Sequence, residues 1–323
     1  MRARKGERGM ALLLVLLVVA LLTTLLVEFA FSTLVDLRLT ETFRDSTQAY
    51  YLAKGGVTAG SMLLKEDRNR YDSLDEMWSQ GISNYPVGHG FISIRISDLG
   101  GKLAVNRLVE GNSPQAVMVD RFYRLFANLG LDRQIDPAEL TAALIDWLDS
   151  GDDTYRELRV DGRSMPVAGA EAPYYRGLPR PYACKNGRLH TLDELALVKG
   201  FTPEVLRLAT PHLAVNGEEQ LNININTASE AVLMTLDPLI DRKLAEKIVA
   251  YRAATPLTTL ASLESILPAD AYSALRTLEN LGQLGVTSQL YRIEAEALVN
   301  DGHRRMVAEV EKKSSKLLYL KVD

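Results

Sequence analysis

MRARKGERGMALLLVLLVVALLTTLLVEFAF, residues 1–31, is the stretch that decides the fold. It begins with a leader, residues 1–9, that carries four basic residues and one acidic residue. The segment that follows, residues 10–31, is apolar and contains no charged residue before Glu28. As a helix, its 22 residues rise roughly 33 Å, which is enough to cross the hydrocarbon core of a bilayer. We therefore expect a membrane-spanning helix at the N-terminus.

An ordinary secretory signal peptide is the alternative interpretation of this start. Such peptides have an apolar core of about 7 to 15 residues and small residues at the cleavage site. Here the apolar run is longer, and Phe29, Phe31 and Leu34 stand where small residues are expected. Apolar residues continue at helical spacing to about residue 65, and no proline occurs before Pro86. The pattern favours one long helix over residues 10–65.

A basic leader that ends in glycine before an apolar helix resembles the class III signal of type IV pilins and type II secretion pseudopilins. In that family the prepilin peptidase cuts after the glycine, so the resemblance implies cleavage between Gly9 and Met10. Most members carry a glutamate at the fifth position of the mature chain, where this sequence has Leu14. The resemblance implies that this glutamate neutralises the terminal amine of a neighbouring subunit within the membrane, where an unpaired charge is costly. A subunit with Leu14 cannot make that contact.

The length and composition of the chain indicate that a globular part follows this helix. The 323 residues are 47% hydrophobic and 24% charged, with a formal net charge of −4, which gives no overall attraction to nucleic acid or anionic lipid. Cys184 is the only cysteine, which excludes an intramolecular disulfide and a thiolate metal cluster. A chain of this length suggests about two domains.

Strand patterns occur on both sides of a helical block. Residues 91–97 alternate between isoleucine and polar residues, and the DLGG that follows predicts a hairpin with residues 102–106. Residues 291–299 alternate again, and a return strand through residues 306–310 and a last strand at residues 316–322 complete the pattern. Strands that flank a block of helices predict an α+β fold with an insertion.

The block between the strands, residues 113–282, shows apolar residues at helical spacing in seven segments. Together with the pilin resemblance, this predicts a type IV pilin-like α+β fold: a long N-terminal helix plus a small antiparallel sheet, with a large inserted all-α domain. The expected divisions are a leader at 1–9, a transmembrane and stem helix at 10–65, sheet segments at 66–112 and 283–323, and the insertion at 113–282.

An acidic loop, residues 146–171, lies within the predicted insertion and reads DWLDSGDDTYRELRVDGRSMPVAGAE. It holds seven acidic and three basic residues. Oxygen ligands at short, irregular spacing in a glycine-containing loop suit calcium, which accepts six to eight oxygens with loose geometry. The alternative is a solvated acidic loop that caps helices, which predicts no response to calcium.

A second segment, residues 221–263, resembles the helix-hairpin-helix units of DNA-binding competence proteins. In DNA-binding versions, the backbone amides of a glycine-rich turn contact phosphate. Here the turn contains Asp237, Pro238 and Asp241; proline has no amide to donate, and the carboxylates repel phosphate. Residues 222–282 carry five basic and seven acidic residues, so we expect no binding to nucleic acid.

The sequence contains no constellation that indicates catalysis. The four histidines have no zinc-ligand spacing, and no serine lies in a Gly-x-Ser-x-Gly motif. Trp147, Tyr174 and Tyr175 near the acidic loop are interpreted as packing residues. We expect no enzyme activity.

The whole order of features is similar to the minor pseudopilin K family of type II secretion systems. The shared features are a prepilin leader without the glutamate, the DLGGKLAVNRL segment, the Asp-Trp-x-Asp acidic loop and the Asn-Thr-Ala segment at residues 226–228. Family members bind calcium in the acidic loop. The ligands that the resemblance implies here are Asp149, Asp152, Asp153 and Glu171.

The resemblance also implies a role without chemistry. Family members form a complex with the minor pseudopilins I and J at the tip of a periplasmic pseudopilus, and are anchored in the inner membrane by one helix with the C-terminal part in the periplasm. The prepilin peptidase and other pseudopilins are further expected partners. A membrane-anchored DNA receptor of a competence system and an adhesin-like pilus tip are the alternatives.

Overall fold

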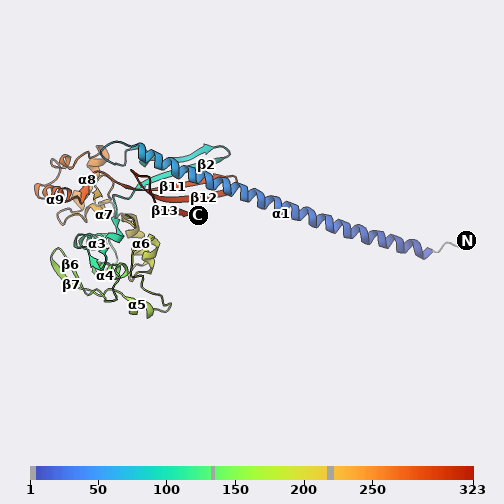
Figure 1. Cartoon of the computed structure of the whole chain (residues 1–323), viewed down its shortest axis with the longest axis horizontal. Coiled ribbons are helices and arrows are strands. Elements are labelled where there is room, and N and C mark those ends of the chain that lie inside the picture. The colour runs from blue at the N-terminus through green and yellow to red at the C-terminus, as the bar shows by residue number, and fades with distance from the viewer. Residues whose placement is uncertain (1–4, 132–134, 217–221) are drawn as a thin grey trace.

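The computed structural model describes residues 5–131, 135–216 and 222–323. Leader residues 1–4 therefore lie outside the described residues. Helix α1, Lys5–Glu66, is one continuous helix of 62 residues, which confirms the predicted long N-terminal helix. Its N-terminal half extends away from the rest of the molecule, and its C-terminal half lies along a sheet (Figure 1). The part from Gly9 onward is long and apolar enough to cross a membrane.

Within the described residues, the main sheet has five antiparallel strands in the order β1-β2-β11-β12-β13. They are β1 Ile82–Val87, β2 Gly90–Asp98, β11 Leu290–Val299, β12 Gly302–Glu311 and β13 Leu317–Val322. The three predicted C-terminal strands are confirmed, with Asn300 in the left-handed region at the β11–β12 turn. One face of the sheet packs on α1, where alternate isoleucines of β2 are buried.

Close packing of helix and sheet depends on glycine. A Cβ on Gly56 would lie 2.6 Å from Ile92 Cδ1, and one on Gly60 would lie 2.9 Å from Ile293 Cγ2. A Cβ on the neighbouring Gly55 would have no atom within 4 Å. Two glycines on one helix face thus let the backbone of α1 approach the sheet.

The predicted hairpin between residues 91–97 and 102–106 is wrong. Residues Leu103–Ala104 (β3) instead pair in parallel with Leu213–Ala214 (β8), and β2 pairs with β1 on one side and β11 on the other. The chain leaves the sheet after Asp98, where Leu99 N donates to Leu290 O and Gly101 lies against Thr227. The actual partner, β1, is an exposed edge strand that contains Pro86 and lacks apolar alternation, so its pattern predicts no strand.

The insertion therefore runs from the end of β2 to the start of β11, a longer stretch than the expected 113–282. Its hydrophobic core is a cluster of its own, distinct from the two clusters between α1 and the sheet. The insertion lies at the end of the molecule opposite the N-terminus (Figure 1). This confirms the predicted pilin-like α+β fold with a large inserted helical domain.

The elements of the insertion are mostly short helices. The α-helices are α3 Ala116–Asn128, α4 Pro137–Leu148, α5 Ala172–Arg176, α6 Pro203–Ala209, α7 Glu230–Leu233, α8 Arg242–Ala254 and α9 Ala269–Asn280; the 3₁₀ helices are Val105–Arg107, Leu192–Leu197, Thr210–His212 and Leu260–Leu263. Besides β3 and β8, the short strands pair as β4 Val109–Glu110 with β5 Ser113–Pro114, β6 Glu157–Val160 with β7 Arg163–Pro166, and β9 Ile223–Asn224 with β10 Leu284–Gly285. Outside the insertion, α2 Met77–Gln80 precedes β1. The sequence did not predict these small ladders.

Candidate metal centre

Helix α4 carries the first two carboxylates of a buried acidic group. Asp136 is the N-cap of this helix, and its Oδ1 accepts a hydrogen bond from Ala138 N at 2.8 Å, with Pro137 in the first turn. Asp146 lies in its last turn, and Asp149 is the residue at which it ends. Because these two are three residues apart on a helix, their side chains lie on the same face.

The third carboxylate comes from the other end of the acidic loop. Glu171 is the N-cap of α5. The β6–β7 hairpin lies between the two helices in the chain and returns the backbone, so that Gly169 N donates to Tyr155 O. Carboxylate oxygens of Asp146, Asp149 and Glu171 all lie within 4.8 Å of one another, and all three residues are buried.

Burial raises the pKa of each carboxylate, and the charges of its neighbours raise the pKa of Asp146 and Glu171 further. The pKa of Asp146 is raised to about 6, chiefly by burial, with a further contribution from Asp149. Burial, then the charges of Asp146 and Asp149, raise the pKa of Glu171 to about 7. Burial also raises the pKa of Asp149. Three buried carboxylates this close together resist ionisation. A bound cation would stabilise their charged forms.

Two oxygens in this group have no hydrogen-bond donor among the described residues. Asp146 Oδ1 accepts from Tyr155 N at 2.9 Å, but Asp146 Oδ2 is buried without a hydrogen-bond partner among the described residues. Likewise Glu171 Oε2 accepts from Ala172 N at 3.3 Å, while Glu171 Oε1 has no partner in the described part of the chain. Unpaired buried oxygens are uncommon, and here they fit a hard cation that takes oxygen ligands.

Gly169 leaves room for this group. A Cβ at this position would lie 2.0 Å from Asp146 Oδ2, so any larger residue would displace the carboxylate. The carboxylates thus fit together only with glycine opposite them.

Of the four ligands implied by the family resemblance, the structure brings together Asp149 and Glu171. Asp152 and Asp153 are exposed on the same loop, and their carboxylates are not part of the group. Asp152 is near enough that its charge contributes to the raised pKa of Glu171. Asp146 joins the group although the predicted set omits it; its i, i+3 spacing to Asp149 was the signal that could have identified it.

Surrounding side chains hold the loop in place. Asn186 Nδ2 donates to Gly151 O at 2.7 Å, and Ser150 N donates to Asn112 Oδ1 at 3.1 Å. Trp147 is buried with its ring edge-on to Tyr175, 5.1 Å between centroids, which confirms that both are packing residues. Burial raises the pKa of the Cys184 thiol to about 11, which leaves it protonated at neutral pH.

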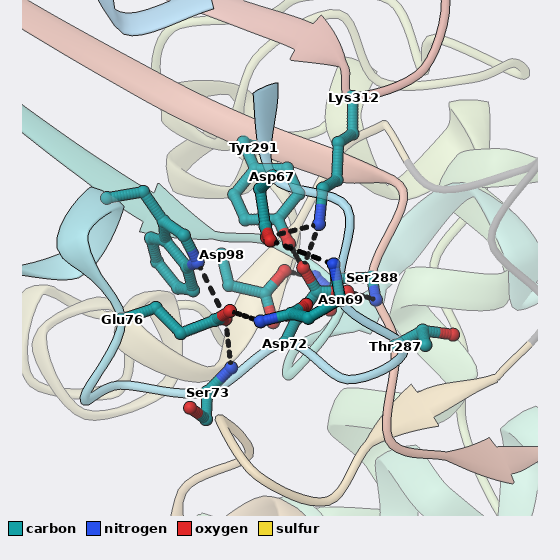
Figure 2. A network of polar contacts seen from close by, with 12 residues as sticks. Asp67, Asn69, Asp72, Ser73, Glu76, Asp98, Thr287, Ser288, Tyr291 and Lys312 are labelled. Carbon is teal, nitrogen blue, oxygen red and sulfur yellow. Dashed lines mark hydrogen bonds and ion pairs between the residues drawn. The ribbon is translucent and has the colours of Figure 1, made fainter. Parts of the chain in front are cut away.

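A second acidic group, Asp67, Asp72 and Glu76, is already paired with a positively charged side chain of the protein. Lys312 Nζ contacts carboxylate oxygens of both Asp67 and Asp72 (Figure 2). Glu76 Oε2 accepts hydrogen bonds from Ser73 N at 2.8 Å and Trp78 Nε1 at 2.9 Å. This group is a satisfied polar network, in contrast to the group at Asp146.

The same network joins the insertion to the sheet, at the end of β2 and just before β11. Asp98 ends β2, and Ser288 lies just before β11; Ser288 Oγ donates to Asp98 Oδ2 at 2.7 Å. Ser288 N donates to Asp72 Oδ2 at 2.7 Å, and Tyr291 OH donates to Asp72 Oδ1 at 2.6 Å (Figure 2). Asn224 of the insertion adds a bond from Nδ2 to Asp72 O at 3.0 Å. The network therefore joins the end of α1, the sheet and the insertion.

The helix-hairpin-helix-like segment uses its polar groups internally. Asp241 caps α8 by accepting from Leu244 N at 2.9 Å, and Asp237 accepts from Leu239 N at 2.9 Å. Asn226 both donates to Leu257 O and accepts from Leu257 N, each at 2.9 Å, which gives the asparagine of the Asn-Thr-Ala segment a structural role. Carboxylates that cap the turn amides do not favour phosphate binding there.

At the N-terminus, the predicted cleavage residues lie within α1. Gly9 and Met10 are exposed, and Leu14 is exposed on the apolar part of the helix.

Comparison of the sequence with known proteins finds matches to one protein family. A family model described as type II secretion system (T2SS), protein K, matches residues 101–218, and a second model of the same description matches residues 223–287. A type II secretion system protein K from Pectobacterium carotovorum is 31% identical over 70% of this chain and 68% of its own length. The protein of that name from Pseudomonas aeruginosa is 30% identical over 77% of this chain and 73% of its own.

The fold is also similar to a solved structure. A chain in the crystal structure of the GspK-GspI-GspJ complex from the enterotoxigenic Escherichia coli type 2 secretion system matches with a TM-score of 0.66. The match covers 90% of this chain and 99% of the other, at 19% identity. At that identity the similarity concerns the fold.

Proposed function

Because this chain belongs to the type II secretion system protein K family, we propose that it is a minor pseudopilin that assembles with the minor pseudopilins I and J at the tip of the pseudopilus and supports protein export across the outer membrane. The observation that carries this proposal is the family membership, which rests on family models over residues 101–218 and 223–287 and on relatives that are 30–31% identical. The matched chain of similar fold comes from a complex of GspK with GspI and GspJ. The proposed role is structural, and none of its steps requires a catalytic residue.

Two features of this chain support a position at the tip. Leu14 lacks the carboxylate that would pair with a neighbouring subunit ahead of it in the membrane. The insertion lies at the end of the molecule opposite the N-terminus, where a subunit stacked above would have to fit (Figure 1).

The test is assembly of the full-length chain with I and J. Coexpressed in the inner membrane and extracted in a non-ionic detergent, the three proteins should copurify through a tag on this chain and elute together from a size-exclusion column. Elution of a well-folded tagged chain without I and J would contradict the proposal.

We infer that the chain is held in the inner membrane by α1, with the sheet and insertion in the periplasm. The support is the apolar segment of α1, whose side chains from Met10 onward are exposed as a lipid-facing helix requires. The same proposal includes processing by the prepilin peptidase, and N-terminal sequencing of the mature protein should then begin at Met10. Accessibility of the insertion to a protease added to spheroplasts tests the orientation.

We propose that the acidic group binds calcium through Asp146, Asp149 and Glu171, with Asp152 and Asp153 as nearby candidates for further oxygen ligands. The support is the pair of unpartnered buried oxygens among the described residues, together with Gly169 opposite them. A bound divalent cation would neutralise the three carboxylates and join the end of α4 to the start of α5. Its contribution would be to stabilise the insertion.

Thermal unfolding of the full-length chain in detergent tests this proposal. Calcium at about 100 times its dissociation constant should add about 2.7 kcal/mol to the free energy of unfolding, and a chelator should remove that gain. Asp149→Ala should lose the response, whereas Asp193→Ala, an exposed aspartate of the same domain, should keep it. The response of Asp153→Asn to calcium shows whether binding needs only the buried carboxylates or also an exposed aspartate of the predicted set. Equal melting with calcium and with chelator would refute the calcium site.

A further inference from the structure

A pocket of about 790 Å³ opens at the N-terminus of α3 in the insertion. Its walls come from the first turn of α3, from residues 106–107 and 109–111, and from residues 186–188. This volume is within the range of small-molecule sites. Among the described residues that line it, none belongs to the acidic group of Asp146, Asp149 and Glu171, although Leu148 and Ser150 flank Asp149 in the chain; Glu110 is the acidic residue of its lining.

Arg121 supplies a buried positive charge to this pocket. Its residue surface is 2% exposed, and it lines the pocket from α3. Arg121 Nη2 donates to Gln283 Oε1 at 3.3 Å, but Nε has no hydrogen-bond partner within the described ranges. Burial, with the nearby charges of Arg107 and Arg124, lowers the pKa of Arg121 to about 10, so the group stays charged at neutral pH.

A charge so deeply buried is normally paired with an opposite charge. No ion pair joins Arg121 to a carboxylate in the part of the chain that the structure describes. The charges of Arg107 and Arg124, which act on Arg121, carry the same sign and make its burial less favourable. An anion in the pocket would supply the missing counter-charge.

The start of α3 adds donors to the same place. The N-cap residue Gln115 makes no side-chain cap bond to α3; its Nε2 donates instead to Ser113 O at 3.2 Å. Met118 N donates to Gln115 O at 2.8 Å, so the first-turn amides that remain for a ligand are those of Ala116 and Val117, at the positive end of the helix dipole. Gln115, Ala116 and Val117 all line the pocket. Helix N-termini of this kind bind carboxylates and phosphates.

We propose that this pocket binds a small anion that carries a carboxylate or phosphate group, with Arg121 as its buried counter-charge and the first-turn amides of α3 as further donors. Val109, Val117 and Met118 give the pocket an apolar wall. A ligand that combines an anionic group with an apolar portion therefore fits better than a bare inorganic ion. The proposal is independent of assembly with other pseudopilins.

Thermal unfolding of the full-length chain in a non-ionic detergent, with sodium benzoate, sodium phosphate or sodium chloride at equal ionic strength, tests the proposal. Benzoate or phosphate should raise the melting temperature above its value in chloride, and calorimetric titration should give saturable binding. A response to benzoate alone identifies a carboxylate ligand, and a response to phosphate alone identifies a phosphate ligand. Equal melting in all three salts would overturn the proposal.

Matched variants locate the site. Arg121→Met should bind the responsive anion roughly tenfold or more weakly, whereas Arg207→Met, an exposed arginine on α6, should bind like the wild type. Ala116 is exposed at the rim of the pocket, so Ala116→Trp fills the pocket without changing the core and should also lose binding. This variant still tests the location of the anion if Arg121→Met does not fold. Undiminished binding by folded Ala116→Trp and Arg121→Met would place the anion elsewhere and overturn the proposal.

Discussion

Gly169 is the residue on which the geometry of the acidic group depends most directly. In Gly169→Ala the new Cβ would lie 2.0 Å from Asp146 Oδ2, so the carboxylate must move away from Asp149 and Glu171. We expect a loss of roughly 1–3 kcal/mol in the free energy of unfolding from overpacking, and weaker calcium binding. Denaturant unfolding with and without calcium measures both effects.

Gly187→Ala is the matched control for this substitution. Its Cβ would meet only Lys185 O, at 3.8 Å, which is an ordinary contact. Calcium binding and stability should be close to those of the wild type. If both variants respond to calcium like the wild type, the Asp146 carboxylate is not a ligand.

At this scale the sequence identified the acidic loop, and the predicted set included two of its buried members, Asp149 and Glu171, but not the third, Asp146. Composition alone cannot separate Asp146, which is fully buried, from Asp153, which is exposed, because both are aspartates in one polar stretch. The separation comes from the end of α4, which turns Asp146 inward, and from the β6–β7 hairpin, which brings Glu171 back to it. Sequence patterns do not determine such a return of the chain.

At the scale of elements, the packing of α1 on the sheet predicts opposite effects at two adjacent glycines. Gly56→Leu should destabilise the chain by roughly 1–3 kcal/mol, because its side chain would collide with Ile92 and Ala295. Gly55→Leu points to open space and should be neutral or stabilising by up to about 1 kcal/mol, since leucine favours a helix more than glycine does. Thermal unfolding compares the two, and equal effects would contradict the close helix–sheet contact.

The polar network around Lys312 predicts that the free energy of unfolding decreases at alkaline pH. Burial alone lowers the pKa of Lys312, but its hydrogen bonds to Asp67 and Asp72 outweigh burial, and the pKa is raised. A raised pKa means that the charged lysine stabilises the folded chain below its unfolded pKa of about 10.4, and that this stabilisation is lost as pH rises through the folded pKa. Lys312→Met should therefore be less stable at pH 7, by roughly 3 kcal/mol or more.

The difference between the wild type and Lys312→Met should shrink above about pH 10, as the wild-type lysine loses its proton. Denaturant unfolding between neutral and alkaline pH follows this difference. Lys313→Met removes a neighbouring exposed lysine and should change little at either pH. A difference that stays constant into strong alkali would show that the ion pairs with Asp67 and Asp72 are not its source.

The strands show what could be predicted at this scale. Strands β11 and β12 were predictable because each has one buried face, which produces alternation, and because Asn300 marks the turn between them. The DLGG turn after β2 was misinterpreted because a turn signal states only that the chain reverses, not which strand it meets. Its true continuation depends on Asp98, Asn224 and Ser288, which lie far apart in the sequence and close together in the fold.

At the scale of the whole molecule, two separate cores predict that the insertion can be removed. Asp98 and Tyr291 lie opposite each other in the β2–β11 ladder, so a two-residue Asn-Gly turn in place of residues 99–290 would close a regular hairpin. The clusters between α1 and the sheet contain no residue of the insertion, among the residues that the structure describes. The trimmed chain should keep a folded helix and sheet, as circular dichroism and cooperative thermal unfolding would measure.

The trimmed chain also tests how the proposed tip position arises. If the insertion blocks a further subunit, its removal should let pseudopilins add above this chain, and gold-labelled antibody should then mark the shaft of isolated pseudopili. The full-length chain should be labelled at tips alone. If the folded trimmed chain still marks only tips, the block lies instead in the membrane segment, where Leu14 lacks a charge to offer the next subunit. Leu14→Glu in the trimmed chain would then be the change that moves the label into the shaft, since it restores the carboxylate that pairs with a neighbouring amine.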